Sequence, residues 1–198
     1  MTEKIVSKAS ELFLKCGFKS VSMDDIAAEL CVSKKTIYKY FSSKDVLVAD
    51  CSRSINKEVF NNIQAIRAKN FNAIEENFEI VKMIKEMFKA STSSHMYELK
   101  KHYPALYNEF AAEEELACKE LFISNMERGI QQGLYRPNFS IQNYSMFYYL
   151  LIFCINSNVV NEQELINVEL EALEYHTRAI VTASGLIELE KQLELIKE

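Results

Sequence analysis

Residues that interrupt helices are scarce in this sequence. Only two prolines, Pro104 and Pro137, and four glycines occur among its 198 residues. Long stretches rich in Glu, Lys, Leu, Ala and Ile place apolar residues at helical spacing, and most of these residue types favour helices intrinsically. The pattern predicts an all-α protein. A chain of this length can form one sizeable core, or a small domain joined to a larger one.

The cysteines and the hydropathy of the chain indicate the cellular compartment in which we expect it. The cysteines are odd in number and widely separated, and they predict neither a disulfide framework nor a zinc site; they are Cys16, Cys31, Cys51, Cys118 and Cys154. The longest apolar run, residues 146–155, has half the length that a membrane-spanning helix needs, and no secretion signal opens the chain. We expect a cytoplasmic protein with no membrane segment.

Charge is distributed unevenly along the chain. The whole chain carries a net charge of −5, which by itself argues against binding to nucleic acid, because phosphates attract Lys and Arg. The first 50 residues, however, carry eight lysines against seven acids, and residues 31–44 contain four lysines and no acid. A run of this kind is often only a solvated helix face. The residues around this lysine run decide whether it binds nucleic acid or is only a solvated helix face.

Helix-capping residues divide the N-terminal segment into short helices. Thr2 is expected to cap a first helix that Gly17 ends, with apolar positions at Ile5, Ala9, Leu12, Phe13 and Cys16. Ser22 and Asp25 predict a capping box at the start of a second helix over residues 23–30. The N-termini of these two helices are predicted from local sequence, because each depends only on residues within one helical turn.

A two-residue break follows the second helix, and Ser33 is expected to cap a third helix over residues 34–41. Two short helices joined by a tight turn form a helix-turn-helix. Ser42 and Asp45 are expected to cap a long fourth helix that begins at residue 43 or 44. The residues expected to face inward are Ile26, Ala27, Leu30, Val32, Ile37 and Phe41.

The third helix then presents amine, hydroxyl and phenol groups to the outside. Such groups suit phosphates and base edges in a DNA major groove, where a helix of this kind docks. The outward residues are Lys34, Lys35, Thr36, Tyr38 and Lys39.

The same residues resemble the DNA-binding domain of the TetR/AcrR family of one-component regulators, through the block FLKCGFKSVSMDDIAAELCVSKKTIYKYFSSKDVL. The shared elements are a Gly-Phe after the first helix, a Ser capping the second, an Ile-Ala pair, Val-Ser, Thr-x-Tyr-x-x-Phe and Lys-Asp. Two departures stand out, because the family often has Gly where Cys31 and Lys35 stand. Lys35 adds a further candidate contact to DNA, so the operator cannot be copied from a relative.

The resemblance implies an N-terminal helix-turn-helix DNA-binding domain over residues 1–46 and a helical effector-binding and dimerisation domain over residues 47–198. It also implies contacts from helix starts to phosphates. Tyr40 has a second interpretation, as a half-buried core residue. The implied contacts are base edges for Lys34, Lys35 and Thr36, DNA backbone or neighbouring bases for Tyr38, Lys39 and Tyr40, and phosphates for Ser22 and Lys44, with Ser33 in the same set.

The rest of the sequence predicts a helical body. A short helix should end before Pro104, since the residue before a proline avoids helical geometry, and the segment GIQQGLYRPN resembles the link between the seventh and eighth helices of the family. The expected helices cover residues 44–68, 72–90, 96–101, a stretch of roughly 28 residues that stops at Gly129 and Gly133, residues 140–158 and 162–184, and a short C-terminal segment.

The two helices within residues 140–184 are the expected dimer surface. The run MFYYLLIFCI is apolar on all sides, which predicts burial on two sides of its helix. The resemblance implies that both helices pair with their symmetry mates in a four-helix bundle, and a large monomeric core is the alternative. A dimer would also supply two heads for a two-fold operator. The stripe expected on the second helix is Leu165, Val168, Ala172, His176, Ala179 and Ala183.

The resemblance further implies a small-molecule effector among the body helices, although each candidate residue would suit an ordinary core equally well. The candidates include few charged groups, which favours an apolar or aromatic effector over a sugar phosphate. They are Phe78, Met83, Met87, Tyr97, His102, Tyr103, Tyr107, Phe110, Cys118, Phe122, Met126, Phe147, Tyr148 and Leu151.

Other functional classes find less support. No enzyme, cofactor or metal site is expected, because His95, His102 and His176 have no metal-binding spacing and the known hydrolase and phosphate-binding motifs are missing. An adaptor with a helix-turn-helix, and a thiol sensor that uses Cys31, stay open as alternatives. Repression is favoured over activation by family habit only, and the sequence names neither the effector, the operator nor the regulated genes.

Overall fold

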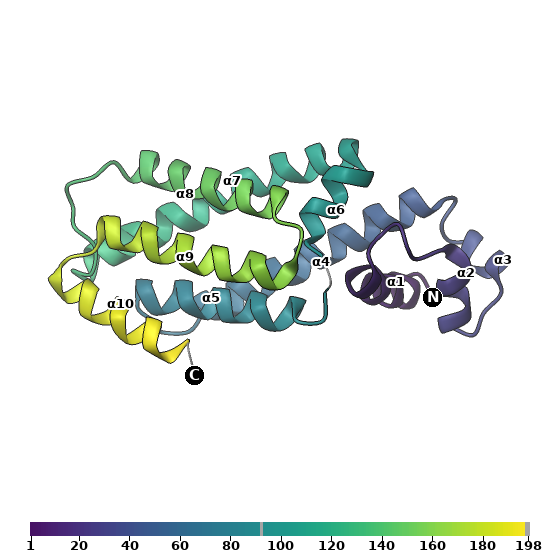
Figure 1. The fold of residues 1–198 in the computed structure, drawn as a ribbon, viewed down its shortest axis with the longest axis horizontal. Coiled ribbons are helices and arrows are strands. Elements are labelled where there is room, and N and C mark those ends of the chain that lie inside the picture. The colour runs from purple at the N-terminus through teal and green to yellow at the C-terminus, as the bar shows by residue number, and fades with distance from the viewer. Residues whose placement is uncertain (92, 197–198) are drawn as a thin grey trace.

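The computed structural model describes residues 1–91 and 93–196, and all regular elements in these residues are helices. The molecule is elongated. Helices α1, α2 and α3 lie together at one end, α4 leads from them toward the remaining helices, and α10 lies at the opposite end (Figure 1). The all-α prediction is confirmed.

The first three helices are α1 (Thr2–Cys16), α2 (Met23–Glu29) and α3 (Lys34–Tyr38). We call residues 1–43 the head. Each helix turns an apolar side toward the middle of the head, and burial of these side chains is what holds such short helices together. The core residues they supply are Ile5, Ala9, Phe13, Met23, Ile26, Ala27 and Ile37, joined by Phe18, Val21 and Phe41 from the connections.

The capping predictions are mostly confirmed. Ser22 forms the expected capping box with Asp25, and the Ser33 hydroxyl accepts a hydrogen bond from the backbone N–H of Thr36. Gly17 ends α1 with a φ of 79°, a conformation that glycine adopts without strain.

Three details of the head were predicted wrongly. Thr2 is the first residue of α1 rather than its cap, because Met1 takes the capping position and offers no side-chain acceptor. The third helix ends at Tyr38 and not at residue 41, since the chain turns there and brings Phe41 into the core. Ser43 caps α4 instead of Ser42, because Ser43 has the extended backbone that a cap requires.

Helix α4 (Lys44–Arg67) connects the head with the remaining helices. Its first turns complete the core of the head through Leu47, Val48 and Cys51, which are fully buried. It then continues without interruption along α5, and we call the described part of residues 68–196 the body. The predicted bounds, 44–68, are met within one residue.

The next three helices are α5 (Ala73–Phe88), α6 (His95–His102) and α7 (Pro104–Gln131). Asn72 starts α5 with a second capping box, to which Glu75 contributes. Pro104 is the first residue of α7, a position where its missing N–H would have no partner within the helix.

Helix α6 carries the contact between body and head. The Phe18 ring, which follows α1, meets the rings of His95 and Tyr103 edge-on, with centroids 5.2 Å and 5.8 Å away. Leu99 and Phe110 belong to the same hydrophobic cluster as the core of the head. One core therefore extends across the position, 46/47, where we expect the domain boundary.

The last helices are α8 (Ile141–Asn158), α9 (Glu162–Ile180) and α10 (Ala183–Leu195). The helix predicted over residues 162–184 ends at Ile180, because Val181 forms an antiparallel bridge with Tyr135 and Thr182 caps α10. Ala183 therefore lies on α10 and not on the stripe assigned to α9.

The expected dimer stripe of α9 needs a second correction. Leu165, Ala172 and His176 are buried within this chain, where α9 packs on α5 and α8. Helix α9 is amphipathic, so its small and apolar residues cover the chain's own core. Its outward face presents other residues, among them Tyr175.

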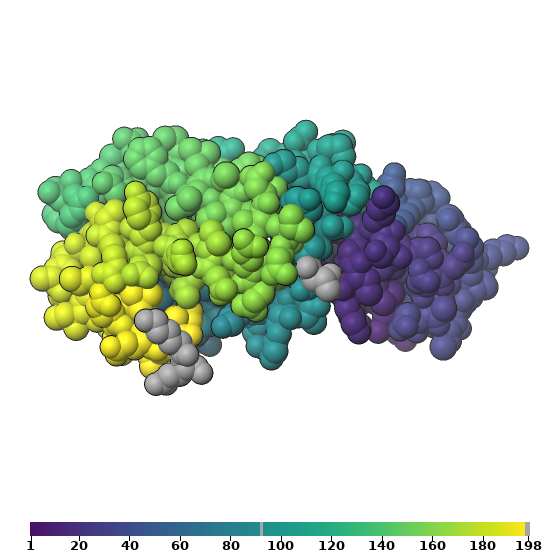
Figure 2. Space-filling view, viewed as in Figure 1, coloured from purple at the N-terminus to yellow at the C-terminus, as the bar shows by residue number. Residues whose placement is uncertain are grey.

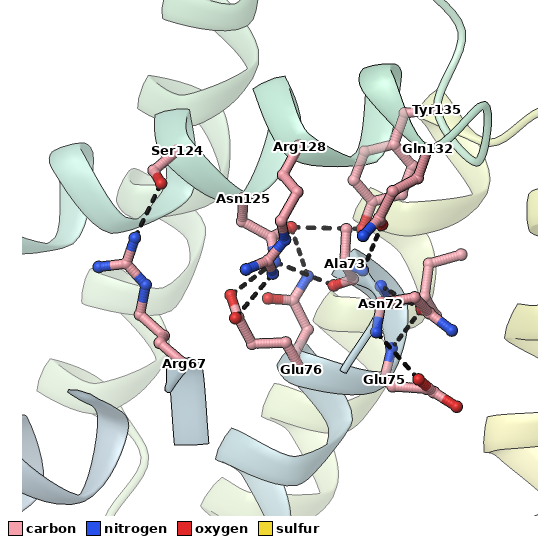
Figure 3. Close-up of polar contacts among 12 residues, drawn as sticks. Arg67, Asn72, Ala73, Glu75, Glu76, Ser124, Asn125, Arg128, Gln132 and Tyr135 are labelled. Atoms are coloured by element: carbon pink, nitrogen blue, oxygen red, sulfur yellow. Dashed lines mark hydrogen bonds and ion pairs between the residues drawn. The ribbon is translucent and has the colours of Figure 1, made fainter. Parts of the chain in front are cut away.

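A buried polar cluster joins α5 to the end of α7 (Figure 3). The Glu76 carboxylate, which is 2% exposed, lies 2.7 Å from the guanidinium of Arg128, and Asn125 donates hydrogen bonds to Glu76 and to the Ala73 carbonyl. The Tyr135 hydroxyl donates to Asn125 from the link after α7. Charged groups buried this deeply are usually paired.

Tyr135 reaches this cluster because a glycine lies beneath its ring. A Cβ atom built on Gly129 would overlap the Tyr135 ring, so the close approach requires glycine. Gly133, in the same link, is different. It has a φ of 71° and open space around it.

We predict that Gly129→Ala destabilises the protein by about 1–3 kcal/mol, because overpacking against the ring outweighs the gain of up to ~1 kcal/mol in helix propensity. Urea unfolding followed by circular dichroism measures the change. Gly133→Ala is the matched control, and it should cost about 1 kcal/mol through its backbone conformation alone. A Gly129→Ala variant as stable as the parent would contradict the close contact.

Candidate DNA-binding surface and body cavity

The turn between α2 and α3 is set by two backbone hydrogen bonds. The Cys31 N–H donates to the Ala28 carbonyl at 3.0 Å, and the Val32 N–H donates to the Ala27 carbonyl at 2.9 Å. These two bonds form a Schellman motif, which places Cys31 in the left-handed region with a φ of 53°. The family preference for glycine here thus has a conformational reason, and cysteine occupies the position under strain.

The turn aims α3 away from the core of the head. Ile37 is fully buried and anchors the helix, whereas Tyr38 and Tyr40 are 45% and 46% exposed. Tyr40 follows α3 in a turn and is not among the core residues of the head, although its 46% exposure still leaves about half of its surface covered. Lys35 and Lys39 are also exposed.

All nine residues expected to bind DNA lie on the head or at the first residue of α4. Seven of them are exposed, and Thr36 and Lys44 are partly buried. The Thr36 hydroxyl lies 2.8 Å from the Ser33 hydroxyl, so both can turn toward a ligand together. Because the head occupies one end of the elongated molecule (Figure 2), this surface is open to a large partner.

Two of the lysines have partners within the chain. The Lys34 ammonium lies 2.8 Å from a carboxylate oxygen of Asp24 on α2, and this hydrogen bond raises the pKa of Lys34. The Lys44 ammonium lies 6.0 Å from the centroid of the Phe13 ring, and partial burial lowers its pKa. Lys34 therefore has to exchange an exposed carboxylate for any ligand that it binds.

The body contains a cavity of about 510 Å³, bounded by α4, α5, α7, α8 and α9 and by the start of α6. Aromatic rings form part of its lining. The ring centroids of Phe122 and Tyr148 are 4.7 Å apart, and behind them Tyr148 stacks on His176 with centroids 4.3 Å apart. Four of the candidate effector residues line the cavity, namely Phe110, Cys118, Phe122 and Tyr148.

The other ten candidates do not line the cavity, for three reasons. Some complete cores, some lie where α6 meets α7 and the head, and some lie on other surfaces of α5 and α8. Helical periodicity marks an apolar side without saying whether that side meets a neighbour or a void. The ten are Phe78, Met83, Met87, Tyr97, His102, Tyr103, Tyr107, Met126, Phe147 and Leu151.

The expectation of few buried charges is wrong. Glu162 and Glu169 of α9 line the cavity while only 4% and 8% exposed, and Glu114 of α7 joins them there. A sequence signal for them did exist. Glu162 and Glu169 are two turns apart and share one face with Leu165 and Ala172, so carboxylates occur within an apolar stripe.

Burial controls how these groups titrate. Burial, followed by the neighbouring charge of Glu169, raises the pKa of Glu162 to about 7, and burial raises the pKa of Glu169 to the same value despite a hydrogen bond from Asn156. The pKa of Glu114 is raised for the same reason. Burial lowers the pKa of His95 to about 4, so this imidazole is neutral at neutral pH.

Within residues 1–91 and 93–196, no helix is long and apolar enough to cross a bilayer. In the same part of the chain, no three His, Cys, Asp or Glu side chains are arranged to hold a metal ion.

Residues 5–51, which include the helix-turn-helix, match the family of bacterial regulatory proteins called tetR. This chain therefore carries a TetR-type DNA-binding segment. The uncharacterized HTH-type transcriptional regulator YvaF of Bacillus subtilis (strain 168) is 29% identical to it over 113 residues. That alignment covers 53% of this chain and 56% of YvaF, so it spans about half the length of each protein.

Solved structures show that the TetR-type fold extends over the body. A transcriptional regulator from Cytophaga hutchinsonii has a TM-score of 0.73 at 17% identity, over 91% of this chain and 98% of its own. A protein from Saccharomonospora viridis, solved in complex with choline, has a TM-score of 0.69 at 17% identity, over 91% and 97% of the two chains.

The strained turn at Cys31 gives a prediction. Cys31→Gly should leave the free energy of unfolding unchanged or raise it by up to about 1 kcal/mol, because relief of the left-handed strain exceeds the entropy cost of glycine. Cys31→Val should lower it by about 1 kcal/mol or more, since a branched Cβ fits this region worst. Thermal and urea unfolding measure both. Equal stability of the Gly and Val variants would contradict the assigned conformation.

Proposed function

We propose that the protein is a one-component transcriptional repressor that binds a palindromic operator as a homodimer and is released by a small effector with a largely apolar body. One observation carries the proposal. Helix α4 begins at Lys44, beside the candidate DNA-binding surface, and its later turns line the cavity through Ile55, Phe60 and Ile63. A single continuous helix therefore touches both sites.

The head supplies the DNA-binding half of the proposal. The N-terminal turn of α3 presents Lys34, Lys35 and Thr36 for base edges, and Tyr38 and Lys39 lie beside them for the DNA backbone. Side chains of this kind read the major groove by hydrogen bonds, whereas phosphate contacts fix the position on the duplex.

An exposed apolar surface on α8 and α9 supports a homodimer. Met146, Phe147 and Leu150 of α8 are exposed, and so is Tyr175 of α9. The two helices adjoin on the body surface (Figure 2). Apolar groups clustered on a surface favour association, and a two-fold pair of heads suits two operator half-sites about one DNA turn apart.

The cavity supplies the effector half. Its volume lies within the range of about 300–1,000 Å³ that is typical of small-molecule sites. A protein of the same fold was solved with choline, which is consistent with a ligand site in this kind of body. His95 lines the cavity and also contacts Phe18 of the head, so α6 offers a second route by which a ligand can bias the head.

We predict separate roles for the head residues. Lys44→Ala should weaken binding to all DNA sequences alike and reduce the salt slope by about 1, whereas Lys34→Ala and Thr36→Ala should each cost about 1–3 kcal/mol, mainly on the operator. Fluorescence anisotropy with operator and scrambled duplexes, at several salt concentrations, measures both effects and the expected two chains per operator. Lys85→Ala, on an exposed site of the body, is the control. Equal losses on both duplexes for every variant would disprove this division.

The experiment that tests the whole proposal is a linkage measurement. Any molecule that thermal-shift screening finds to bind should lose affinity by about 5- to 150-fold when the operator is bound, because the coupling between two sites is reciprocal. Phe122→Ala and Tyr148→Ala should change this response while leaving operator affinity in the ligand-free protein intact. Calorimetric titration with and without operator gives the factor. An effector affinity indifferent to operator would show that the protein is not a ligand-released regulator.

A further inference from the structure

Three carboxylates of the cavity, Glu114, Glu162 and Glu169, have no basic partner among the described residues. Within the described residues, no ion pair joins Glu114, Glu162 or Glu169 to a lysine, arginine or histidine. This contrasts with Glu76, another carboxylate of the lining, which is paired with Arg128. Buried carboxylates are normally paired, so three unpaired ones in one cavity require an explanation.

Glu162 provides the second observation. Glu162 lines the cavity and is only 4% exposed. Its Oε2 atom is buried and has no hydrogen-bond partner. An unsatisfied polar atom of this kind costs stability in the ligand-free protein. Glu169 lies close enough to raise the pKa of Glu162, so the two carboxylates act on the same region of the cavity.

The bases of the lining do not neutralise this region. They belong to α4 and are Arg53, Lys57 and Arg67. Arg53 pairs with Glu109, Arg67 donates a hydrogen bond to the Ser124 hydroxyl (Figure 3), and Lys57 is exposed at the surface. His95 is neutral, because burial lowers its pKa to about 4. The carboxylate region therefore keeps an excess of acidic groups.

Apolar side chains surround the carboxylates. Phe122, Tyr148, Leu121, Ile152 and Leu165 contribute aromatic and aliphatic surface to the same cavity. Aromatic faces attract cations, and the adjoining carboxylates would neutralise a positive charge in a low-dielectric setting. An anionic ligand would meet repulsion from the same groups.

We propose that the cavity binds an organic cation, with its amine or ammonium group held by Glu162 and Glu169 and its apolar body against Phe122 and Tyr148. Glu114 completes the acidic side. This inference rests on the proposed function, because it names the chemical class of the effector. A cation gives Glu162 Oε2 the partner that the ligand-free chain does not provide.

Matched probes test the charge requirement. The full-length protein, free of DNA, is titrated calorimetrically with phenylbutylamine, phenylbutanol and phenylbutyrate, and with octylamine, octanol and octanoate. Within at least one series, the amine should bind 10-fold or more tightly than the alcohol, and the carboxylate should bind most weakly. The inference is wrong if neither amine binds, or if the alcohols bind as tightly as the amines.

Isosteric variants test the residues. Glu162→Gln and Glu169→Gln should each lower the affinity for the amine about 10-fold while leaving the affinity for the alcohol unchanged. Glu171→Gln, on the exposed face of the same helix, should change neither. Removing a buried charge should not lower the thermal midpoint, which a melting curve checks. Unchanged amine binding in both buried-site variants would overturn the assignment.

The two proposals fail in different ways. If an amine binds with the expected preference but leaves operator affinity unchanged, the cation site stands and effector release is wrong. If a neutral or anionic molecule releases the operator while no amine binds, the regulator stands and the cation site is wrong.

Discussion

The contact of Phe18 with α6 sets the orientation of the head on the body. Without it, the head would be held by α4 alone, and a single helix can pivot at its point of entry. The edge-on packing of Phe18 against His95 and Tyr103 adds a second attachment, and the shared cluster around Leu99 and Phe110 buries it. Attachment through both α4 and Phe18 fixes the orientation of the head relative to the body. The position of the head therefore depends on the packing of the body.

Under the proposed function, this double attachment is the means by which a ligand in the cavity would affect a head that binds DNA. Helices α4 and α6 both line the cavity, and both contact the core of the head. A ligand that favours one spacing of these helices therefore favours one head orientation. Tightly packed interfaces respond by switching between discrete arrangements rather than by bending gradually, which makes small shifts at the cavity effective.

The sequence predicted the parts of the structure that depend on neighbours along the chain. Ser22, Ser33 and Gly17 act within one turn, so their roles could be read directly, and the helix order followed from periodicity. Ser43 replaced Ser42 as a cap because adjacent serines offer equal chemistry. The cavity could not be predicted, since a void depends on how α4, α5, α6, α7, α8 and α9 meet. Glu162 and Glu169 were missed because their apolar stripe was assigned to a partner chain.

The ion pair between Lys34 and Asp24 has a consequence for how binding depends on salt. A free lysine that meets a phosphate displaces a condensed cation from the DNA, and that release into bulk solution produces the salt dependence of affinity. Lys34 brings its own anion, which is tethered to the neighbouring helix and whose charge stays at the interface near the phosphates. Asp24, which loses Lys34 as its partner, would then take up a cation from the solvent in the complex. Under the proposed function, the candidate DNA-binding surface would thus exchange fewer ions with the solvent than its number of lysines suggests, and Lys34 would contribute more to selection of a sequence than to general attraction to DNA.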